Sequence, residues 1–260
     1  MSAPLGKEAW LAACHFHDLS EREVLVEVAE RVRTASKPLV LLDLDSTLYE
    51  VGPRTHQILR EWLESEESRA HPSIRRRLQE LEPPHIGYSL RDTFRAIGLA
   101  LEDPETRRAW EAAKKFWAER FFSSRYLKYD CPYPGAVAFA QRLHGLGAEL
   151  VYLTGRDEPG MGNGTRERLS QDGFPWGVSG THLLLKPESS IPDLQHKLDA
   201  AQYVRQHGTL IASFENEPKN LSALYGQFPD AMHVFVDTVS SDHEAIPCLG
   251  LYRIRGFGVE

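Results

Sequence analysis

Four short, largely apolar runs constrain the fold of this 260-residue chain more than any other feature. They cover residues 38–42, 148–153, 209–214 and 232–236. Runs of this length without polar alternation are typical of strands that are buried on both faces, as in a parallel sheet. A weaker run covers residues 182–185, and residues 249–254 are predicted to add a last edge strand.

Helical segments separate these runs, so the chain alternates between strand and helix. The helical patterns cover residues 135–146, 165–171, 193–206 and 220–228. This alternation predicts an α/β fold, a Rossmann-like three-layer structure in which helices cover both faces of a parallel sheet. Ligands of such sheets bind beyond the carboxyl ends of the strands, so the residues that follow each run are the candidates for function.

Two segments lie outside this alternation. Ser20 and Glu23 have the spacing of a capping box, and we expect residues 1–35 to form a helical N-terminal extension. Residues 51–127 are rich in charge, tryptophan and helix formers, and they contain no convincing strand. We therefore expect an inserted helical lobe there, with residues 36–50 and 128–260 forming the α/β core.

Composition and charge argue against several classes of protein. The net charge is −7 and the sequence pI is about 5.9, so no overall positive field would attract nucleic acid or anionic lipid. No stretch approaches the roughly 18 apolar residues of a membrane span, and a secretory signal pattern is missing. Cys14, Cys131 and Cys248 match no disulfide framework or zinc site and are predicted to be reduced thiols. These features predict a cytoplasmic protein and indicate no particular oligomeric state.

The first strand ends in a dense group of oxygen-bearing side chains, Asp43-Leu44-Asp45-Ser46-Thr47. Two aspartates separated by one residue near a strand end can face the same crevice. Their oxygens suit a hard cation such as magnesium, which binds through one or two carboxylates together with substrate phosphate. A helix N-terminus is the alternative interpretation, with a hydroxyl as the cap and the aspartates favoured by the helix dipole.

The second strand also ends in polar residues. Thr154 and Gly155 place a hydroxyl and an accessible backbone where an anion can bind, although a structural turn explains them equally well. Residues 160–165 contain three glycines but lack the spacing of a nucleotide-binding loop. We predict a flexible loop there.

Two lysines and one acidic residue complete the set of candidates. Either Lys186 or Lys197 could offset the negative charge of a bound phosphate and of neighbouring carboxylates. Glu215 stands at the end of the third apolar run, where a carboxylate can complete a metal site.

The order of these residues resembles the haloacid dehalogenase superfamily of phosphohydrolases. It consists of an Asp-x-Asp segment at Asp43, then Thr154, a lysine and the acidic Glu215. The resemblance covers nearly the whole chain after about residue 36, and it places residues 51–127 where many members carry a helical cap. It implies magnesium-dependent hydrolysis of a phosphate monoester, with a small phosphorylated substrate and an aspartyl-phosphate intermediate.

Carried onto this chain position by position, the resemblance implies a role for each residue. Asp43 is the nucleophile, and Asp45 acts first as a general acid and then as a base. Thr154, with Gly155 and Arg156 beside it, binds the phosphoryl group. A narrower similarity to the phosphatase modules of polynucleotide-kinase-type enzymes rests on Arg156 and the segment that leads toward Lys197.

The resemblance also implies the cationic and metal-binding groups. Lys197 stabilises the phosphoryl oxygens, with Lys186 as the alternative. Lys197 is favoured because it precedes Glu215 by 18 positions, a spacing typical of the family's lysine. The implied magnesium ligands are Asp43, the main-chain carbonyl of Asp45, and Glu215. The family usually has two aspartates in its fourth motif, whereas this chain has Glu215-Asn216. Asn216 adds no charge but can orient a bound water, and Glu217 is a possible substitute.

Two other functions use the same residues. The first is phosphoryl transfer to an acceptor other than water. The second is a catalytically weak, regulatory protein that binds a phosphorylated ligand, an alternative that Asn216 raises. Substrate selection in capped members depends on cap residues, and four residues of the lobe are candidates for such contacts or for its core and surface. They are His85, Tyr88, Arg91 and Trp117.

Overall fold

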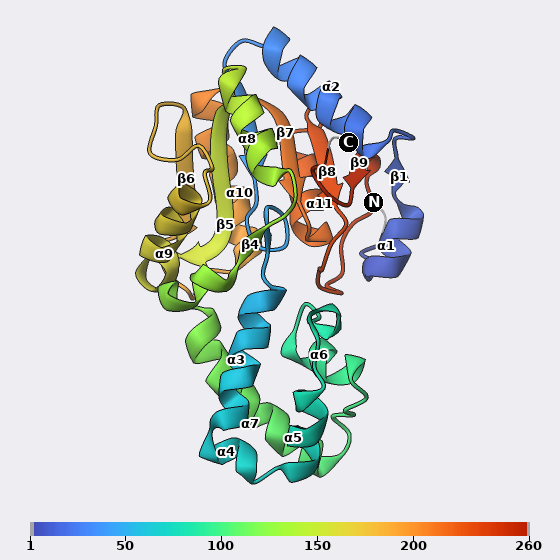
Figure 1. The fold of residues 1–260 in the computed structure, drawn as a ribbon. Coiled ribbons are helices and arrows are strands. Elements are labelled where there is room, and N and C mark those ends of the chain that lie inside the picture. Colours follow the sequence, from blue (N-terminus) through green and yellow to red (C-terminus); the bar gives the residue numbers. More distant parts are fainter. Residues whose placement is uncertain (1–2, 259–260) are drawn as a thin grey trace. The chain divides into compact units, whose positions relative to one another are not determined.

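Seven strands form a single parallel sheet in the order β1-β9-β8-β7-β2-β5-β6 (Figure 1). They are β1 (His15–Phe16), β2 (Pro38–Leu42), β5 (Glu149–Asp157), β6 (Thr181–Lys186), β7 (Thr209–Glu215), β8 (Met232–Val236) and β9 (Leu249–Ile254). This computed structural model describes residues 3–258, which divide into two units. The sheet belongs to the unit that contains the residues up to 49 and those from 132 onward. The predicted parallel α/β fold is confirmed.

Helices cover the two faces of this sheet. Helices α2 (Glu21–Thr34) and α8 (Ala136–Gly145) contact each other on one face, and α10 (Asp193–His207) and α11 (Pro218–Gln227) pack together on the other. The central strand β2 is buried along its whole length, because alternate side chains enter the two layers. Leu39 and Leu41, for example, pack with residues of α10 and α11.

The N-terminal segment contributes both helix and strand. Ser20 and Glu23 form the predicted capping box at the start of α2. A short helix, α1 (Lys7–Ala13), precedes β1, which pairs with β9. Residues 249–254 form the predicted strand, β9, but its predicted place at the edge of the sheet was wrong, because β1 lies outside it. A strand of two residues is too short to leave a periodic pattern in the sequence.

The predicted flexible loop at residues 160–165 was also wrong, because these residues lie inside α9 (Glu158–Gln171). The Asp157 side chain caps this helix by accepting a hydrogen bond of 2.7 Å from the Gly160 N–H. A bidentate ion pair between Glu158 and Arg166 crosses Gly162, where an added Cβ would lie 2.7 Å from the Glu158 carboxylate. The Asp157 cap offsets part of the cost of the three glycines in this helix, each of which costs about 1 kcal/mol relative to alanine.

Residues 50–131 form the second unit, which is helical and has its own core. Its elements are α3 (Gly52–Glu64), α4 (Glu66–Arg69), α5 (Pro72–Gln79), α6 (Leu90–Ala96), α7 (Pro104–Phe121) and the 3₁₀ turns Pro83–His85 and Ser124–Tyr129. Trp62, Phe94 and Ala109 are fully buried in this core. A two-stranded ladder joins β3 (Tyr49–Glu50) to β4 (Cys131–Pro132). Among residues 3–258, we find no helix with the length and apolar character needed to cross a membrane.

One ion pair in the helical unit is completely buried. Arg54, near the start of α3, donates two hydrogen bonds of 2.7 Å to the two carboxylate oxygens of Asp130. Neither side chain is exposed to solvent. The same guanidinium lies 4.2 Å from the centre of the Phe121 ring and donates to the Phe121 carbonyl. The pair therefore connects residues near both ends of the inserted unit.

Replacement of Arg54 by methionine should lower the free energy of unfolding by about 3–5 kcal/mol, because Asp130 would remain buried without a counter-ion. Urea unfolding, followed by tryptophan fluorescence, measures this loss. The matched control combines Arg54→Met with Asp130→Leu, which removes both charges and should recover most of the lost stability. A single variant as stable as the wild type would contradict this account.

Candidate active site

The loop after β2 is the centre of the site. Asp43 directly follows this strand, and its side chain is only 9% exposed. Its backbone N–H donates to the Phe214 carbonyl of β7. Ser46 adopts a left-handed conformation with a φ of 61°, which is unfavourable for a residue other than glycine. The Ser46 N–H donates to the Tyr49 carbonyl at 2.7 Å, and the Ser46 carbonyl accepts from the Thr238 hydroxyl. These contacts hold a strained, tight loop around Asp43.

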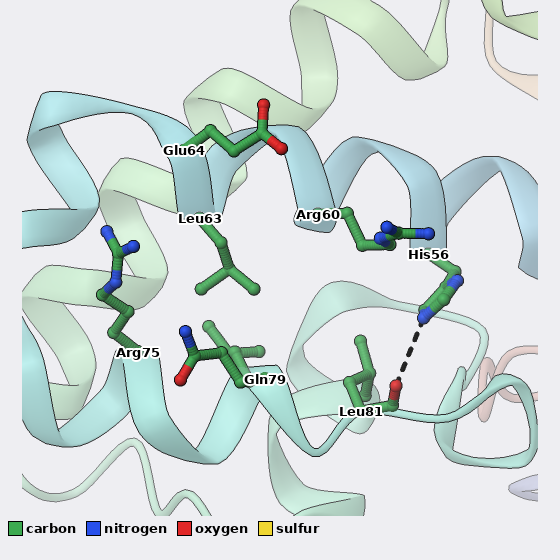
Figure 2. A pocket seen from close by; sticks show the side chains of 8 residues that line it. His56, Arg60, Leu63, Glu64, Arg75, Gln79 and Leu81 are labelled. Atoms are coloured by element: carbon green, nitrogen blue, oxygen red, sulfur yellow. Dashed lines mark hydrogen bonds between the residues drawn. The ribbon is translucent and has the colours of Figure 1, made fainter.

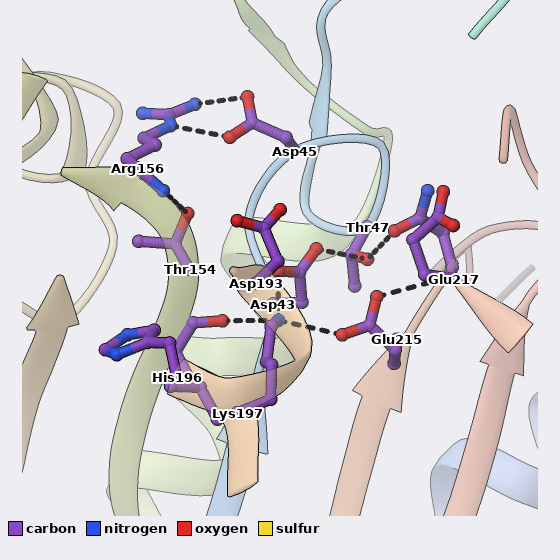
Figure 3. A network of polar contacts seen from close by, with 12 residues as sticks. Asp43, Asp45, Thr47, Thr154, Arg156, Asp193, His196, Lys197, Glu215 and Glu217 are labelled. Atoms are coloured by element: carbon purple, nitrogen blue, oxygen red, sulfur yellow. Dashed lines mark hydrogen bonds and ion pairs between the residues drawn. The ribbon is translucent and has the colours of Figure 1, made fainter. Parts of the chain in front are cut away.

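Lys197 joins two carboxylates at this loop (Figure 3). Its ammonium donates to Asp43 Oδ1 at 2.5 Å, to Glu215 Oε2 at 2.7 Å and to the Leu153 carbonyl at 2.8 Å. All three of its N–H donors are thus satisfied. Because β7 and β5 flank β2 on either side, their carboxyl ends bring Glu215 and Leu153 next to Asp43.

Helix α10 places Lys197 there, and its pattern explains why. The buried side of this helix carries Lys197, Ala200, Ala201 and Val204, which follow the spacing of a single helical face. Lys186, in contrast, ends β6, and its ammonium donates to Asp193 at 2.8 Å. Of the two candidate lysines, Lys197 is the one that contacts Asp43.

Asp45 faces a different partner. The Arg156 guanidinium donates from Nε to Asp45 Oδ2 at 2.8 Å and from a terminal nitrogen to Oδ1 at 2.9 Å (Figure 3). The Arg156 side chain is 1% exposed and the Asp45 side chain 31%. Arg156 was expected beside a bound phosphoryl group, but its guanidinium is engaged with the carboxylate of the expected acid.

Thr154 and Gly155 lie in the last, irregular part of β5. The buried Thr154 hydroxyl accepts a hydrogen bond of 3.2 Å from the Arg156 N–H, which leaves the hydroxyl proton for another acceptor. An added Cβ at Gly155 would lie 2.6 Å from the carboxylate of Asp193, so this position requires glycine while Asp193 stays in place. Asp193 was not predicted, and its place at the start of α10 gave no signal beyond that of an ordinary first-turn acid.

Asn216, which follows β7, was expected to orient a bound water, but its side chain contacts two other residues. Its amide oxygen accepts from the Thr47 hydroxyl at 3.2 Å, and its amide nitrogen donates to the Val239 carbonyl at 2.6 Å. The Thr47 hydroxyl also lies 2.9 Å from Asp43 Oδ2. Asn216 therefore connects the loop of Asp43 to the segment after β8. An aspartate could accept from Thr47 but could not donate to a carbonyl, so the amide suits this position.

Glu217 also contacts the segment after β8. Its carboxylate accepts from the Ser241 N–H at 2.8 Å and from the Ser241 hydroxyl. The Glu217 N–H donates to Glu215 Oε1 at 3.0 Å and so helps to orient that carboxylate. Glu217 thus holds a loop next to the site, and Glu215 is the carboxylate that faces Lys197.

Burial controls the protonation of these groups. It raises the pKa of Asp43 to about 7, with a further increase from the negative charge of Glu215 and an opposing effect of Lys197. Burial also raises the pKa of Glu215 and of Glu217. Burial acts to lower the pKa of Lys197, but Asp43 and Glu215 outweigh it and raise that pKa, so the ammonium stays charged.

The donor set fits a hard divalent cation. Within residues 3–258 we find no cluster of three carboxylate, imidazole or thiol side chains that could bind a metal. The expected ligand set needs only two such side chains, Asp43 and Glu215, together with the main-chain carbonyl of Asp45, and all are oxygen donors. When ionised, Asp43 and Glu215 share the single charge of Lys197, which leaves a net charge of −1 in a buried place. That excess negative charge favours a cation.

Three of the four lobe residues considered for substrate contacts have partners within the lobe. The Trp117 indole donates to the Thr55 hydroxyl at 3.0 Å and stacks on Phe121. His85 Nδ1 accepts from the Glu82 N–H, and Arg91 lies over the Trp110 ring. A separate cavity of about 480 Å³ lies between α3 and α5, with Arg60 and Arg75 among its lining residues (Figure 2). None of the four considered residues lines this cavity.

Several solved structures are similar to this chain at low sequence identity. A structure from Clostridium difficile, provisionally named a phosphatase, aligns with a TM-score of 0.50 at 15% identity over 83% of this chain and 94% of its own. A predicted phosphatase from Clostridium acetobutylicum gives 0.46 at 14% identity, over 82% and 94%. A magnesium-bound structure from Bacillus subtilis, provisionally named a HAD-hydrolase, gives 0.41 at 16%, over 86% and 96%. No curated protein matches the chain.

The sequence comparison is more specific than these structural similarities. The profile of the haloacid dehalogenase-like hydrolases matches residues 37–182, which is more than half of the chain and includes Asp43, Asp45 and Thr154. The chain therefore belongs to the haloacid dehalogenase-like hydrolase family.

Proposed function

We propose that this protein is a magnesium-dependent phosphatase that hydrolyses a small phosphate monoester through an aspartyl-phosphate on Asp43. The observation that carries this proposal is the Lys197 ammonium, which bridges Asp43 and Glu215 at the carboxyl ends of β2 and β7. A buried cation between two carboxylates is a costly arrangement that a merely structural site could replace with apolar residues. The phosphatase name of the similar Clostridium difficile structure is consistent with this reaction.

The proposed reaction consists of two successive displacements at phosphorus. A carboxylate oxygen of Asp43 attacks phosphorus while the bond from phosphorus to the ester oxygen breaks, and the Asp45 carboxyl gives its proton to that oxygen. Water then attacks the phosphorus of the aspartyl-phosphate. Asp45 removes a proton from this water, the acyl-phosphate bond breaks, and Asp43 is released together with inorganic phosphate.

The surrounding groups balance the charge. Lys197 remains within hydrogen-bonding distance of Asp43 and stabilises negative charge that develops on the phosphoryl oxygens. Thr154 donates its hydroxyl proton to one of these oxygens, and the backbone at Gly155 lies close to them. Asp43, the Asp45 carbonyl and Glu215 would hold magnesium, which would supply positive charge that reduces the repulsion between the nucleophile and the phosphate.

Asp45 favours hydrolysis over the two alternative functions. A carboxylic acid at this position can activate water for the second displacement, which a phosphate-binding protein does not need. Phosphoryl transfer to another acceptor would use the same residues and would appear as a loss of phosphate release when that acceptor is added.

We also propose that the helical unit of residues 50–131 acts as a cap that selects the substrate, and that the protein acts in the cytoplasm.

Hydrolysis of p-nitrophenyl phosphate tests the proposed function. We expect release of p-nitrophenolate that requires magnesium, stops with a chelator and returns when the metal is restored. Full activity after chelation, or no hydrolysis of any phosphate monoester with magnesium present, would contradict the proposal.

Metal binding should depend on pH, because Asp43 must lose its proton to bind a cation. With a pKa of about 7 in the metal-free protein, the apparent magnesium affinity should fall about tenfold for each pH unit below 7. In the metal-free protein, the folded state binds the proton of the Asp43 carboxyl more tightly than the unfolded chain does. The contribution of Asp43 to stability therefore decreases as pH rises from about 4 to about 7, and magnesium should offset the decrease.

A thermal-unfolding measurement checks this without relying on activity. A fixed magnesium concentration should raise Tm more at pH 8 than at pH 6. Asp43→Asn should remove most of the dependence on pH, and Asn216→Ala should affect magnesium binding less than Glu215→Gln does. Equal shifts of Tm at both pH values in the wild type would contradict the assignment.

A further inference from the structure

The pairing of Asp45 with Arg156 fixes the direction of the expected acid. Both oxygens of the carboxylate accept from the guanidinium, at 2.8 and 2.9 Å, so the plane of the carboxylate is set as well as its position. Fork-to-fork pairs of this kind restrict orientation in a way that a single ammonium does not. The Asp45 side chain is 31% exposed, so without this partner it could rotate toward solvent.

Arg156 is itself held rigidly. Its guanidinium donates to the Thr165 hydroxyl of α9 at 3.3 Å and lies 5.6 Å from the centre of the Tyr49 ring. Its backbone N–H donates to Thr154. The Thr165 hydroxyl in turn donates to the Met161 carbonyl at 2.8 Å, so the support extends into the helix. With a side-chain exposure of 1%, Arg156 is the buried partner of the pair, and Asp45 is the more exposed one.

Helix α9, which contains three glycines near its start, also supports Arg156. That helix begins directly after β5, and its Asp157 cap fixes the first turn. The resulting helix carries Thr165 to the guanidinium of Arg156. The segment that we expected to be a flexible loop is therefore part of the support for Asp45.

On the basis of the proposed phosphatase function, we infer that Arg156 is a positioning residue that aims the Asp45 carboxyl at the leaving-group oxygen. It does not bind the phosphoryl group. A carboxylate has about four lone-pair positions, and the guanidinium uses two of them. The remaining positions can carry the proton that Asp45 gives to the ester oxygen as its bond to phosphorus breaks.

The inference predicts a loss that depends on the leaving group. p-Nitrophenolate is a stable anion that leaves without a proton, whereas the phenolate of phenyl phosphate benefits from protonation. General acid catalysis contributes about 10²–10⁴-fold when it is needed. Arg156→Ala and Arg156→Lys should therefore lower kcat/KM for phenyl phosphate by about 10²-fold and lower that for p-nitrophenyl phosphate much less. We compare kcat/KM because it reports the first displacement, in which the ester oxygen leaves, whereas kcat also includes the later attack of water that is common to both esters.

The test compares kcat and KM for these two esters in wild type, Arg156→Ala, Arg156→Lys, Asp45→Asn and the double variant Arg156→Lys with Asp45→Asn. Arg166→Ala is the matched control, because Arg166 forms a similar bidentate pair with Glu158 at the exposed surface of α9. It should leave both activities unchanged. Thermal unfolding shows which variants are folded, and Arg156→Lys serves if the alanine variant is not. Added guanidinium ion should partly restore phenyl phosphate hydrolysis in Arg156→Ala.

The expected result is a selective loss with phenyl phosphate that vanishes when Asp45 is already asparagine, because the two residues act through one group. An equal loss of kcat/KM with both esters, or additive effects in the double variant, would overturn the inference while leaving the phosphatase function intact. A wild-type protein that hydrolyses neither ester would overturn both.

Discussion

Replacement of Asp43 by asparagine is expected to leave the fold intact and to lower turnover by about 10⁴-fold or more. An amide has nearly the shape of a carboxylate but is neutral and a poor nucleophile. The variant should be at least as stable as the wild type without metal, because burial in this site disfavours a charge on Asp43. Initial rates with p-nitrophenyl phosphate and the thermal unfolding midpoint measure the two effects.

Two controls make the Asp43 result decisive. Peptide mass spectrometry should show asparagine at position 43 after the assay, because deamidation would restore the carboxylate. The background is low, since uncatalysed hydrolysis of phosphate monoesters is among the slowest known reactions. Near-normal activity in a preparation free of deamidation would exclude Asp43 as the nucleophile.

Replacement of Lys197 should have the second largest effect. Lys197→Ala should lower kcat by about 10²-fold or more, because the phosphoryl oxygens lose the cation nearest to Asp43. Lys186→Ala should change kcat only a few-fold, since that lysine pairs with the half-exposed Asp193. Rates at saturating substrate compare the two variants directly.

Stability must be followed in the same experiment. Loss of Lys197 leaves Asp43 and Glu215 buried side by side, so the variant should unfold more easily when metal is absent. Assays should therefore run well below the unfolding midpoint of each variant. A larger loss of activity from Lys186→Ala than from Lys197→Ala would mean that the assignment of the lysine is wrong.

The strands were predictable from the sequence because the sheet is buried on both faces. The unbroken apolar run of β2, for example, leaves few alternatives to a central strand. The short β1 was not predictable, because it depends on its pairing with β9, which no local pattern identifies. The start of α9 was missed although it carries a local signal, the Asp157 cap followed by Pro159. The three glycines of this segment favoured a loop instead.

Part of the site was predictable because it lies at the ends of the buried apolar strands. Residues that directly follow apolar strands, such as Asp43 and Glu215, could be found because parallel strands bring their carboxyl ends together. The sequence left Lys186 and Lys197 as alternatives. A signal that separates them is that Lys197 lies on the apolar face of α10, where a lysine is rare without a buried partner.

Other parts of the site depend on distant contacts. The bond between Arg156 and Asp45 joins residues 111 positions apart, and the contact of Asn216 with Thr47 joins residues 169 positions apart. No local pattern encodes such pairs. From the sequence, Asn216 is a departure from the family's second aspartate that adds no charge and can orient a bound water. Its hydrogen bond to the Val239 carbonyl gives it a separate local function.

Chemical trapping of the phosphorylated enzyme tests the central claim most directly. Wild-type protein turning over a phosphate monoester with magnesium is quenched in acid and reduced with borohydride, which converts an aspartyl-phosphate to homoserine. Peptide mass spectrometry then locates the modified position. The proposed reaction predicts homoserine at position 43, only when substrate is present, and none in Asp43→Asn. Phosphate hydrolysis without any modification at position 43, or with the modification at another residue, would contradict it.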